Sequence, residues 1–397
     1  GQMDEVAKAL GIDAMELRRR NFIRTGDKNA TGQTIESAVW SDDCMTRALD
    51  ALGTRTPDEG AVRIGRGVAC YQQSYGRISW FHDTSEAWVG AELDGTVVVR
   101  SAVPDIGAGQ VSALCQIAAE VLGVPMDRVT AYAGDTAVNP LAGTSTASRQ
   151  LFMSGNAVRL AASKVRARLV ERAARHFEVE PDRVDLADSH AFVAGEPERT
   201  LPLKELAAVC AAEGVHRSEL AIYRAPFSDR PDEVDLGGRV FPDFTYGAQA
   251  IEVAVDTETG EVSVLKSVGA HDIGQAINPA AVAGQIEGGS VMGHGYALSE
   301  EIVYTEGGIA TPSLSEYLIP TPEDVAEVAA IILESHSGLG PFGAKGIGEP
   351  SFAPVAPAVA NAVADALGVR IFDLPITPER VVKALQDAGE RPRGAGR

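Results

Sequence analysis

The chain has 397 residues, a length typical of two or three domains. Of these residues 45% are hydrophobic and 23% are charged, a composition typical of a globular protein. Its formal charge of −20 would repel a polyanion, which argues against nucleic acid as a partner. No apolar run reaches the roughly 20 residues of a membrane span and no signal peptide is visible, so we expect a cytoplasmic protein without a transmembrane segment.

Residues 1–58 are predicted to form a helical lead. Two short helices over residues 1–24 are separated by Gly11, and Ser41 is a candidate N-cap for a third helix that ends at Leu52. The first helix starts at the first residue, without room for a lead-in. We therefore expect this lead to continue from a first half that lies outside the sequence.

Residues 59–200 are predicted to form a first lobe. Strand patterns cover residues 63–73 and 85–93, and the turn signal Asp94-Gly95 predicts a hairpin with residues 96–103. An apolar-periodic helix over 111–122 follows, then a strand over 128–134 and a long helix that ends near Phe177. Residues 179–200 have the pattern of a short hairpin.

Residues 201–390 are predicted to form a second lobe, and residues 391–397 a tail. A helix over 201–214 leads into an irregular, Pro/Gly/Asp-rich passage, and a hairpin from Thr245 turns at residues 257–260. A helix follows Asn278-Pro279, and residues 324–335 fit a helix or a strand equally well. The C-terminal part is predicted as a helix over 352–367, a strand over 369–375 and a final helix. The fold class is therefore α+β with two lobes.

Four loops rich in glycine, serine or glutamine lie near residues 107–110, 143–150, 284–289 and 340–349. None contains a Walker A motif or a GxGxxG within a βαβ unit, so an ordinary nucleotide-binding domain is disfavoured. The last loop, GLGPFGAKGIGEP, carries Glu349 in a glycine-dense stretch where backbone can approach a ligand closely. The alternatives are a glycine-rich connector with a solvated glutamate and, at 143–150, a polar connection with a helix cap.

Together the loops resemble the molybdenum-cofactor-binding large subunit of the molybdenum hydroxylases, the xanthine dehydrogenase and aldehyde oxidoreductase family. The similarity rests on DIGAGQ, GTSTASRQLFMSGNAV, INPAAVAGQIEGG and GPFGAKGIGEPSFAPVAPAVANAV, and it covers nearly the whole chain as the C-terminal half of that subunit. The resemblance implies a two-lobed molybdopterin-binding fold. It also implies a molybdopterin cofactor, in the simple or the cytosine dinucleotide form, whose dithiolene holds the metal without protein ligands.

The resemblance further implies a role for individual residues. Glu349 would be the active-site base, a role that suits a carboxylate in a dry pocket, and Gln285 would approach the molybdenum end of the cofactor. The segment from Tyr75 to Phe81 falls where the family lines its substrate channel, although packed or exposed loop aromatics remain the alternative. The cofactor-binding set is Gly107, Ala108, Gly109, Gln110, Ser145, Thr146, Ala147, Ser148, Gln150, Gln285, Gly346 and Gly348, and the substrate set is Tyr75, Arg77, Trp80 and Phe81.

Two departures from the family pattern affect these expectations. Many members have Gly-Gln-Gly where this chain has Gly107-Ala108-Gly109, which leaves Gln110 as the substitute for the glutamine. The GGGFGGK-type and Arg-Gly-Phe/Tyr-Gly-type loops of the family's first half do not occur. We therefore expect a second molybdopterin-binding chain to complete the site, with [2Fe–2S] and FAD on further subunits. The four cysteines form no CxxC pair and so favour no cluster on this chain. The substrate would be an aldehyde or an N-heterocycle, and the alternative function is a catalytically silent scaffold or assembly subunit.

Overall fold

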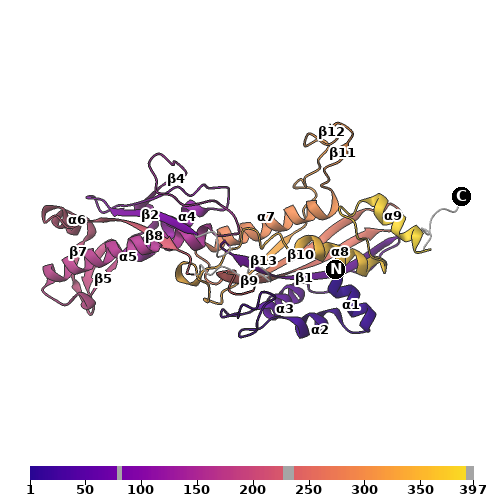
Figure 1. Ribbon diagram of the computed structural model, residues 1–397, viewed down its shortest axis with the longest axis horizontal. Coiled ribbons are helices and arrows are strands. Elements are labelled where there is room, and N and C mark those ends of the chain that lie inside the picture. The colour runs from indigo at the N-terminus through magenta and orange to yellow at the C-terminus, as the bar shows by residue number, and fades with distance from the viewer. Residues whose placement is uncertain (78–82, 227–236, 390–397) are drawn as a thin grey trace.

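The computed structural model describes residues 1–77, 83–226 and 237–389. The molecule is elongated, with one lobe at each end of its long axis (Figure 1). A four-stranded sheet flanked by helices forms the centre of each lobe. This arrangement confirms the predicted α+β class.

The first lobe is built on a sheet with the strand order β4-β3-β2-β8. Its strands are β2 (Thr84–Ala91), β3 (Val97–Ser101), β4 (Val129–Ala133) and β8 (Ser218–Arg224). Strands β2 and β3 form the predicted antiparallel hairpin, and helix α4 (Gln110–Leu122) connects β3 to its parallel neighbour β4. Helices α4 and α5 (Gln150–Phe177) pack on one face, where Ala87, Val89 and Val99 are fully buried.

A small sheet and one helix cap the far end of this lobe. The three antiparallel strands are β5 (Val184–Ala187), β6 (His190–Val193) and β7 (Glu196–Pro202), and helix α6 (Leu203–Ala212) follows them. Their buried residues join the core of α4 and α5. The first lobe therefore has one continuous hydrophobic core.

The second lobe is built on a sheet with the strand order β1-β9-β10-β13. Its strands are β1 (Val62–Tyr75), β9 (Asp243–Asp256), β10 (Val262–Asp272) and β13 (Val328–Leu333). Helix α3 (Ser41–Leu52) packs on one face against Ala248 and Ala250 of β9, and helix α8 (Val355–Leu367) packs on the other face against Ile251 and Val253. Because successive side chains of a strand alternate between faces, the apolar run of β9 serves both cores.

Glycine sets the distance between α8 and the second sheet. A Cβ atom on Gly65 would lie 2.0 Å from the carbonyl oxygen of Ala362, and one on Gly67 would lie 2.2 Å from that of Ala358. Both distances are far below van der Waals contact, so only glycine lets the helix backbone lie directly on β1.

The remaining elements surround these two sheets. Helix α7 (Pro279–Leu298) runs from the centre of the molecule along the second lobe (Figure 1). The others are α1 (Gln2–Leu10), α2 (Ala14–Asn21), α9 (Pro378–Asp387) and the two-stranded ribbon of β11 (Tyr304–Thr305) and β12 (Gly308–Ile309). Within the ranges that the structure describes, no helix has the length and apolar content that crossing a membrane requires.

Several details differ from the predictions. Strand β1 pairs with β9 and strand β8 pairs with β2, so the sheets do not divide the chain at residue 200 as the predicted lobes do. Strand β8 was missed because Leu220 and Ile222, both 51% exposed, place apolar residues on its open face, so the sequence does not alternate between polar and apolar as a strand with one buried face does. The prediction of a strand over 369–375 was wrong: Val369, Ile371 and Leu374 pack against the α8 core from an irregular segment without a strand partner. Ser41 is the first residue of α3, and Trp40 precedes it as the cap.

Candidate active site

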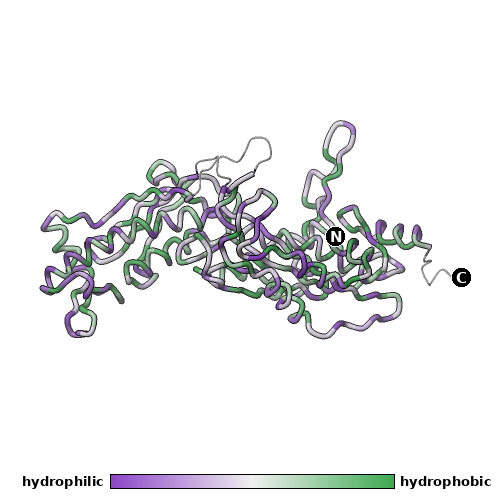
Figure 2. The backbone as a smooth tube through the Cα atoms, turned by 60° about the horizontal axis from the view of Figure 1, so that its bottom comes forward, coloured by the Kyte–Doolittle hydropathy of each residue, from purple (hydrophilic) through white to green (hydrophobic). Residues whose placement is uncertain are grey.

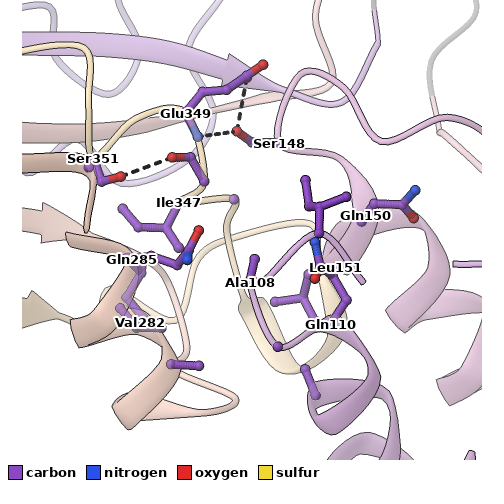
Figure 3. A pocket seen from close by; sticks show the side chains of 18 of the residues that line it. Ala108, Gln110, Ser148, Gln150, Leu151, Val282, Gln285, Ile347, Glu349 and Ser351 are labelled. Atoms are coloured by element: carbon purple, nitrogen blue, oxygen red, sulfur yellow. Dashed lines mark hydrogen bonds between the residues drawn. The ribbon is translucent and has the colours of Figure 1, made fainter. Parts of the chain in front are cut away.

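The four glycine-rich loops meet at one pocket between the two lobes. The pocket has a volume of ≈ 500 Å³. Figure 3 shows Gln285 and Ile347 on one side of it and Gln110 and Leu151 on the other. The predicted residues that line it are Gly107, Ala108, Gly109, Gln110, Ser145, Thr146, Ser148, Gln150, Gln285, Gly346, Gly348 and Glu349.

Three helices begin at this pocket. The first residues of α4 and α5, Gln110 and Gln150, line it directly, and so do Asn278 and Ala281 at the start of α7. Neither α4 nor α5 has a side-chain cap, and none of the three helices carries an acidic residue in its first turn. Backbone N–H groups and the positive ends of the helix dipoles at these helix starts therefore face the same space, which favours an anionic ligand.

The glycines of the pocket have two different roles. A Cβ atom on Gly346 would lie 2.4 Å from the carbonyl oxygen of Ser148, so glycine lets the loops 143–150 and 340–349 touch. A Cβ atom on Gly107 or Gly288 would meet nothing within 4 Å, and one on Gly348 would be 3.9 Å from the Ser148 hydroxyl. These three positions leave open space where a ligand can approach the backbone.

Glu349 is held by two neighbouring side chains. Gln73 Nε2 donates a hydrogen bond of 3.0 Å to Glu349 Oε2. Ser148 Oγ donates to the same oxygen at 3.0 Å, and the Glu349 N–H donates to Ser148 Oγ at 3.1 Å (Figure 3). Within the described residues, both side-chain bonds go to Oε2, which leaves Oε1 for a proton or a ligand. Glu349 itself is exposed, so this chain alone does not provide the dry surroundings that the sequence led us to expect.

A buried ion pair anchors the loop that carries Ser148. Arg149 is fully buried, and its Nε donates to Asp83 Oδ2 at 2.7 Å. The same guanidinium donates to the carbonyl oxygens of Ala142, Thr144 and Thr84 at 2.7 to 3.1 Å. One cation thus satisfies a carboxylate and three carbonyl groups, which fixes both ends of the loop.

A second buried ion pair anchors the loop that carries Glu349. Lys345 Nζ lies 2.7 Å from Asp272 Oδ2, and both side chains are fully buried. Asp272 Oδ1 accepts hydrogen bonds from the Ser335 hydroxyl at 2.7 Å and the Gly274 N–H at 3.1 Å. The loop is therefore fixed to the end of β10, four residues before Glu349.

The glutamines around the pocket differ in their partners. Gln150 donates to Ser145 Oγ at 3.0 Å, so it holds its own loop together. Gln110 Oε1 is buried without a partner among the described residues, and Gln285 Oε1 would be 4.0 Å from a Cβ atom on Gly348. The free acceptor of Gln110 and the uncapped helix ends give the pocket a polar donor and acceptor set that fits a phosphorylated heterocyclic cofactor.

Two of the predicted residues contribute to the loops without lining the pocket. Ala147 accepts a hydrogen bond from the Gly76 N–H at 2.9 Å, and its φ of 50° lies in the left-handed region. Tyr75 is fully buried, its hydroxyl donates to Asp243, and it accepts from the Leu339 N–H at 2.9 Å. Tyr75 is therefore a packed core aromatic, the alternative to a place in the substrate channel, and its ring lies edge-on against Phe152.

The other predicted substrate residues are Arg77, Trp80 and Phe81. Arg77 is half-buried and is not among the residues that line the pocket. Trp80 and Phe81 lie outside the described residues.

Some residues at the pocket were not predicted from the sequence. Gln73 bonds Glu349 from the end of a regular strand, where nothing in the pattern of β1 distinguishes it. Met292 and Phe352 add apolar surface to the rim. In the part of the chain that the structure describes, no three His, Cys, Asp or Glu side chains are grouped as ligands for a metal ion.

Comparisons with known proteins point to one family. Residues 47–326 match the family model of a molybdopterin cofactor-binding domain. The chain is 32% identical to the putative xanthine dehydrogenase molybdenum-binding subunit XdhA of Escherichia coli K12, over 98% of this chain and 51% of that one. It is 30% identical to the aldehyde oxidoreductase of Megalodesulfovibrio gigas, over 97% of this chain and 40% of that one.

A solved structure gives the same result. The crystal structure of quinoline 2-oxidoreductase from Pseudomonas putida 86 superimposes with a TM-score of 0.83 and 29% identity, over 97% of this chain and 51% of that one. The chain thus spans about half the length of the proteins that it matches.

Proposed function

Because this chain belongs to the family of molybdopterin cofactor-binding domains, we propose that it forms one wall of the active site of a molybdenum hydroxylase. The reaction would transfer an oxygen atom from water to a carbon atom of an aldehyde or an N-heterocycle, and that carbon would lose two electrons. The observation that carries the proposal is the shared pocket, in which three helix N-termini and the carboxylate of Glu349 meet.

The chain's contribution to cofactor binding would come mainly from backbone. The backbone N–H groups at the starts of α4 and α5 and the hydroxyls of Ser145 and Thr146 would bind phosphate oxygens. The positive ends of three helices favour a cofactor with several phosphate charges, so we propose the cytosine dinucleotide form of molybdopterin. The bound molybdenum would accept the two electrons that the substrate loses.

Glu349 would act as the general base of the reaction. Ser148 and Gln73 hold Oε2 by two hydrogen bonds, and this fixes the direction of the carboxylate. A positioned base of this kind contributes about 10²- to 10⁴-fold to a rate. Glu349 would take up the proton released in the reaction at Oε1, the oxygen that the neighbouring side chains leave available.

The complete enzyme would include further chains. Glu349 is exposed in this chain, so a second molybdopterin-binding chain would close the pocket and exclude water. Electrons would then pass to a [2Fe–2S] subunit and an FAD subunit.

The test is to replace Glu349 by glutamine within the native complex. Glu349→Gln keeps the size of the side chain and still accepts hydrogen bonds, so we expect an unchanged subunit composition and molybdenum content. The rate with aldehydes or N-heterocycles should fall by at least about 100-fold. Glu287→Gln is the matched control, because Glu287 is an exposed carboxylate of α7 outside the pocket. Undiminished turnover in the Glu349→Gln complex would favour the scaffold alternative instead.

A further inference from the structure

An arm of the chain stands clear of the second lobe. Residues 299–327, called the arm here, connect α7 to β13 and include β11 and β12. Figures 1 and 2 show it projecting from the body in two different views. Tyr304, at 75%, is the most exposed of its large apolar side chains. The exposed large apolar side chains of the arm are Ile302, Val303, Tyr304, Ile309, Leu314, Leu318 and Ile319.

Hydrogen bonds within the arm define its conformation. The Ala310 N–H donates to the carbonyl oxygen of Val303 at 2.8 Å, beside the paired strands β11 and β12. The Tyr317 hydroxyl donates to Glu300 Oε2 at 2.6 Å, and the Ser299 hydroxyl donates to the carbonyl oxygen of Leu318 at 2.8 Å. The arm is therefore a preformed surface that a partner can bind at a small cost in conformational entropy.

The root of the arm is attached to the body. Arg380 of α9 lies 3.1 Å from Glu301. A Cβ atom on Gly295 of α7 would lie 2.6 Å from Cδ of Pro320, so the returning segment of the arm packs closely on the helix. The position of the arm is thus set by α7, the helix that begins at the pocket.

The charge of the arm favours a particular kind of partner. No lysine or arginine occurs between Lys266 and Lys345, and the arm carries seven carboxylates. Contact between the arms of two copies would bring like charges together, and the net charge of −20 opposes a second copy more generally. A different chain, with apolar side chains bordered by lysine or arginine, is complementary to this surface.

An exposed apolar path joins the arm to the pocket. Met292 of α7 lines the pocket and is 59% exposed. Tyr296 lies one turn further along the helix and contacts Phe352, another pocket residue, with a ring-centroid distance of 5.8 Å. The arm begins directly after this helix. A chain that covers the rim at Met292 and Phe352 would therefore lie beside Tyr296 and the root of the arm.

We propose that the arm, together with Met292 and Tyr296, is the docking surface for the chain that closes the Glu349 pocket. This inference rests on the proposed function for the existence of that chain, and the structure adds where it binds. The bound face of the partner would be apolar with a basic border. Large apolar side chains that gather on an exposed segment are typical of a protein interaction surface.

The test uses a photoreactive amino acid in the native complex. A benzophenone side chain at Tyr304 should cross-link to the second molybdopterin-binding chain, identified by mass spectrometry of the joined peptides. The same probe at Leu93, which is 56% exposed in the turn between β2 and β3, is the matched control and should not reach that chain. A cross-link from Tyr304 to a second copy or to an Fe–S or flavin subunit, or no cross-link, would overturn the proposal.

A second measurement keeps the proposal separate from the proposed function. The double substitution Tyr304→Ser and Leu314→Ser should weaken binding of the second chain by about tenfold or more, and Leu93→Ser should not. Both positions are exposed, so circular dichroism should show an unchanged fold. Unchanged affinity of the folded double variant would contradict the docking surface. Normal docking with full turnover of Glu349→Gln would instead contradict only the assigned function.

Discussion

The loops 143–150 and 340–349 form opposite sides of the contact around Glu349, and they are anchored in different ways. In the first loop the buried cation is the hub, since Arg149 donates to Asp83 and to three carbonyl oxygens. In the second loop the buried anion is the hub, since Asp272 accepts from Lys345, Ser335 and Gly274. The planar guanidinium has donors for a whole loop, whereas the lysine ammonium fixes a single point.

The backbones of the two loops also differ, in their φ values and in their use of glycine. The first loop holds Ala147 and Ser148 at a φ of 50°, a region that side chains disfavour, and has the extra bonds of Arg149 to maintain it. The second loop has one such residue, Phe342 at a φ of 56°, and otherwise relies on glycine. A Cβ atom on Gly274 would lie 1.9 Å from the carbonyl oxygen of Gly343, so only glycine permits the contact there. The loop with the stronger side-chain anchor thus holds two adjacent residues in the disfavoured region, whereas the loop with the weaker anchor holds one and packs closely through glycine.

The largest loss of folding stability is expected from Arg149→Met. The substitution leaves the Asp83 carboxylate buried without its cation and leaves three carbonyl groups without their donor. We expect the free energy of unfolding to fall by about 3–5 kcal/mol. Thermal and urea unfolding of the purified chain measure this change. Arg159→Met, at an exposed position of the same helix, is the control and should stay within about 0.5 kcal/mol of the wild type. An equal midpoint for both variants would refute the role of Arg149 as the hub.

Lys345→Met should have the next largest effect. Asp272 keeps its bonds from Ser335 and Gly274, so we expect a loss near the lower end for a broken buried pair, about 3 kcal/mol. The double variant Lys345→Met with Asp272→Asn removes the buried charge and should recover part of this loss. A double-mutant cycle measures the coupling of the two side chains. If the double variant unfolds as easily as Lys345→Met alone, the ion pair does not explain the anchoring.

The glycine loops could be found from the sequence, but their anchors could not. Glycine density, the Glu349-Pro350 step and the start of an apolar helix are local signals within loop 340–349. Asp83 and Arg149 are 66 residues apart, and Asp272 and Lys345 are 73 apart, so no local pattern connects them. For the same reason the sequence did not predict that β1 and β8 exchange between the expected lobes, because strand partners at long range follow from the assembled core.

The smallest change in folding stability is expected from Ala147→Gly. Glycine removes the strain of a left-handed alanine, about 1–2 kcal/mol, but it makes the unfolded chain more flexible, which costs about 0.5–1 kcal/mol. The first term is equal to or larger than the second, so we expect a gain in stability between zero and about 1.5 kcal/mol. Gly343→Ala is the opposite change in the other loop. Its φ is 88° and the new Cβ atom would lie 2.8 Å from the carbonyl oxygen of His336, so this variant should melt below the wild type. If Ala147→Gly also melts below the wild type, the left-handed alanine is not a source of strain, and the contrast between the two backbones is wrong.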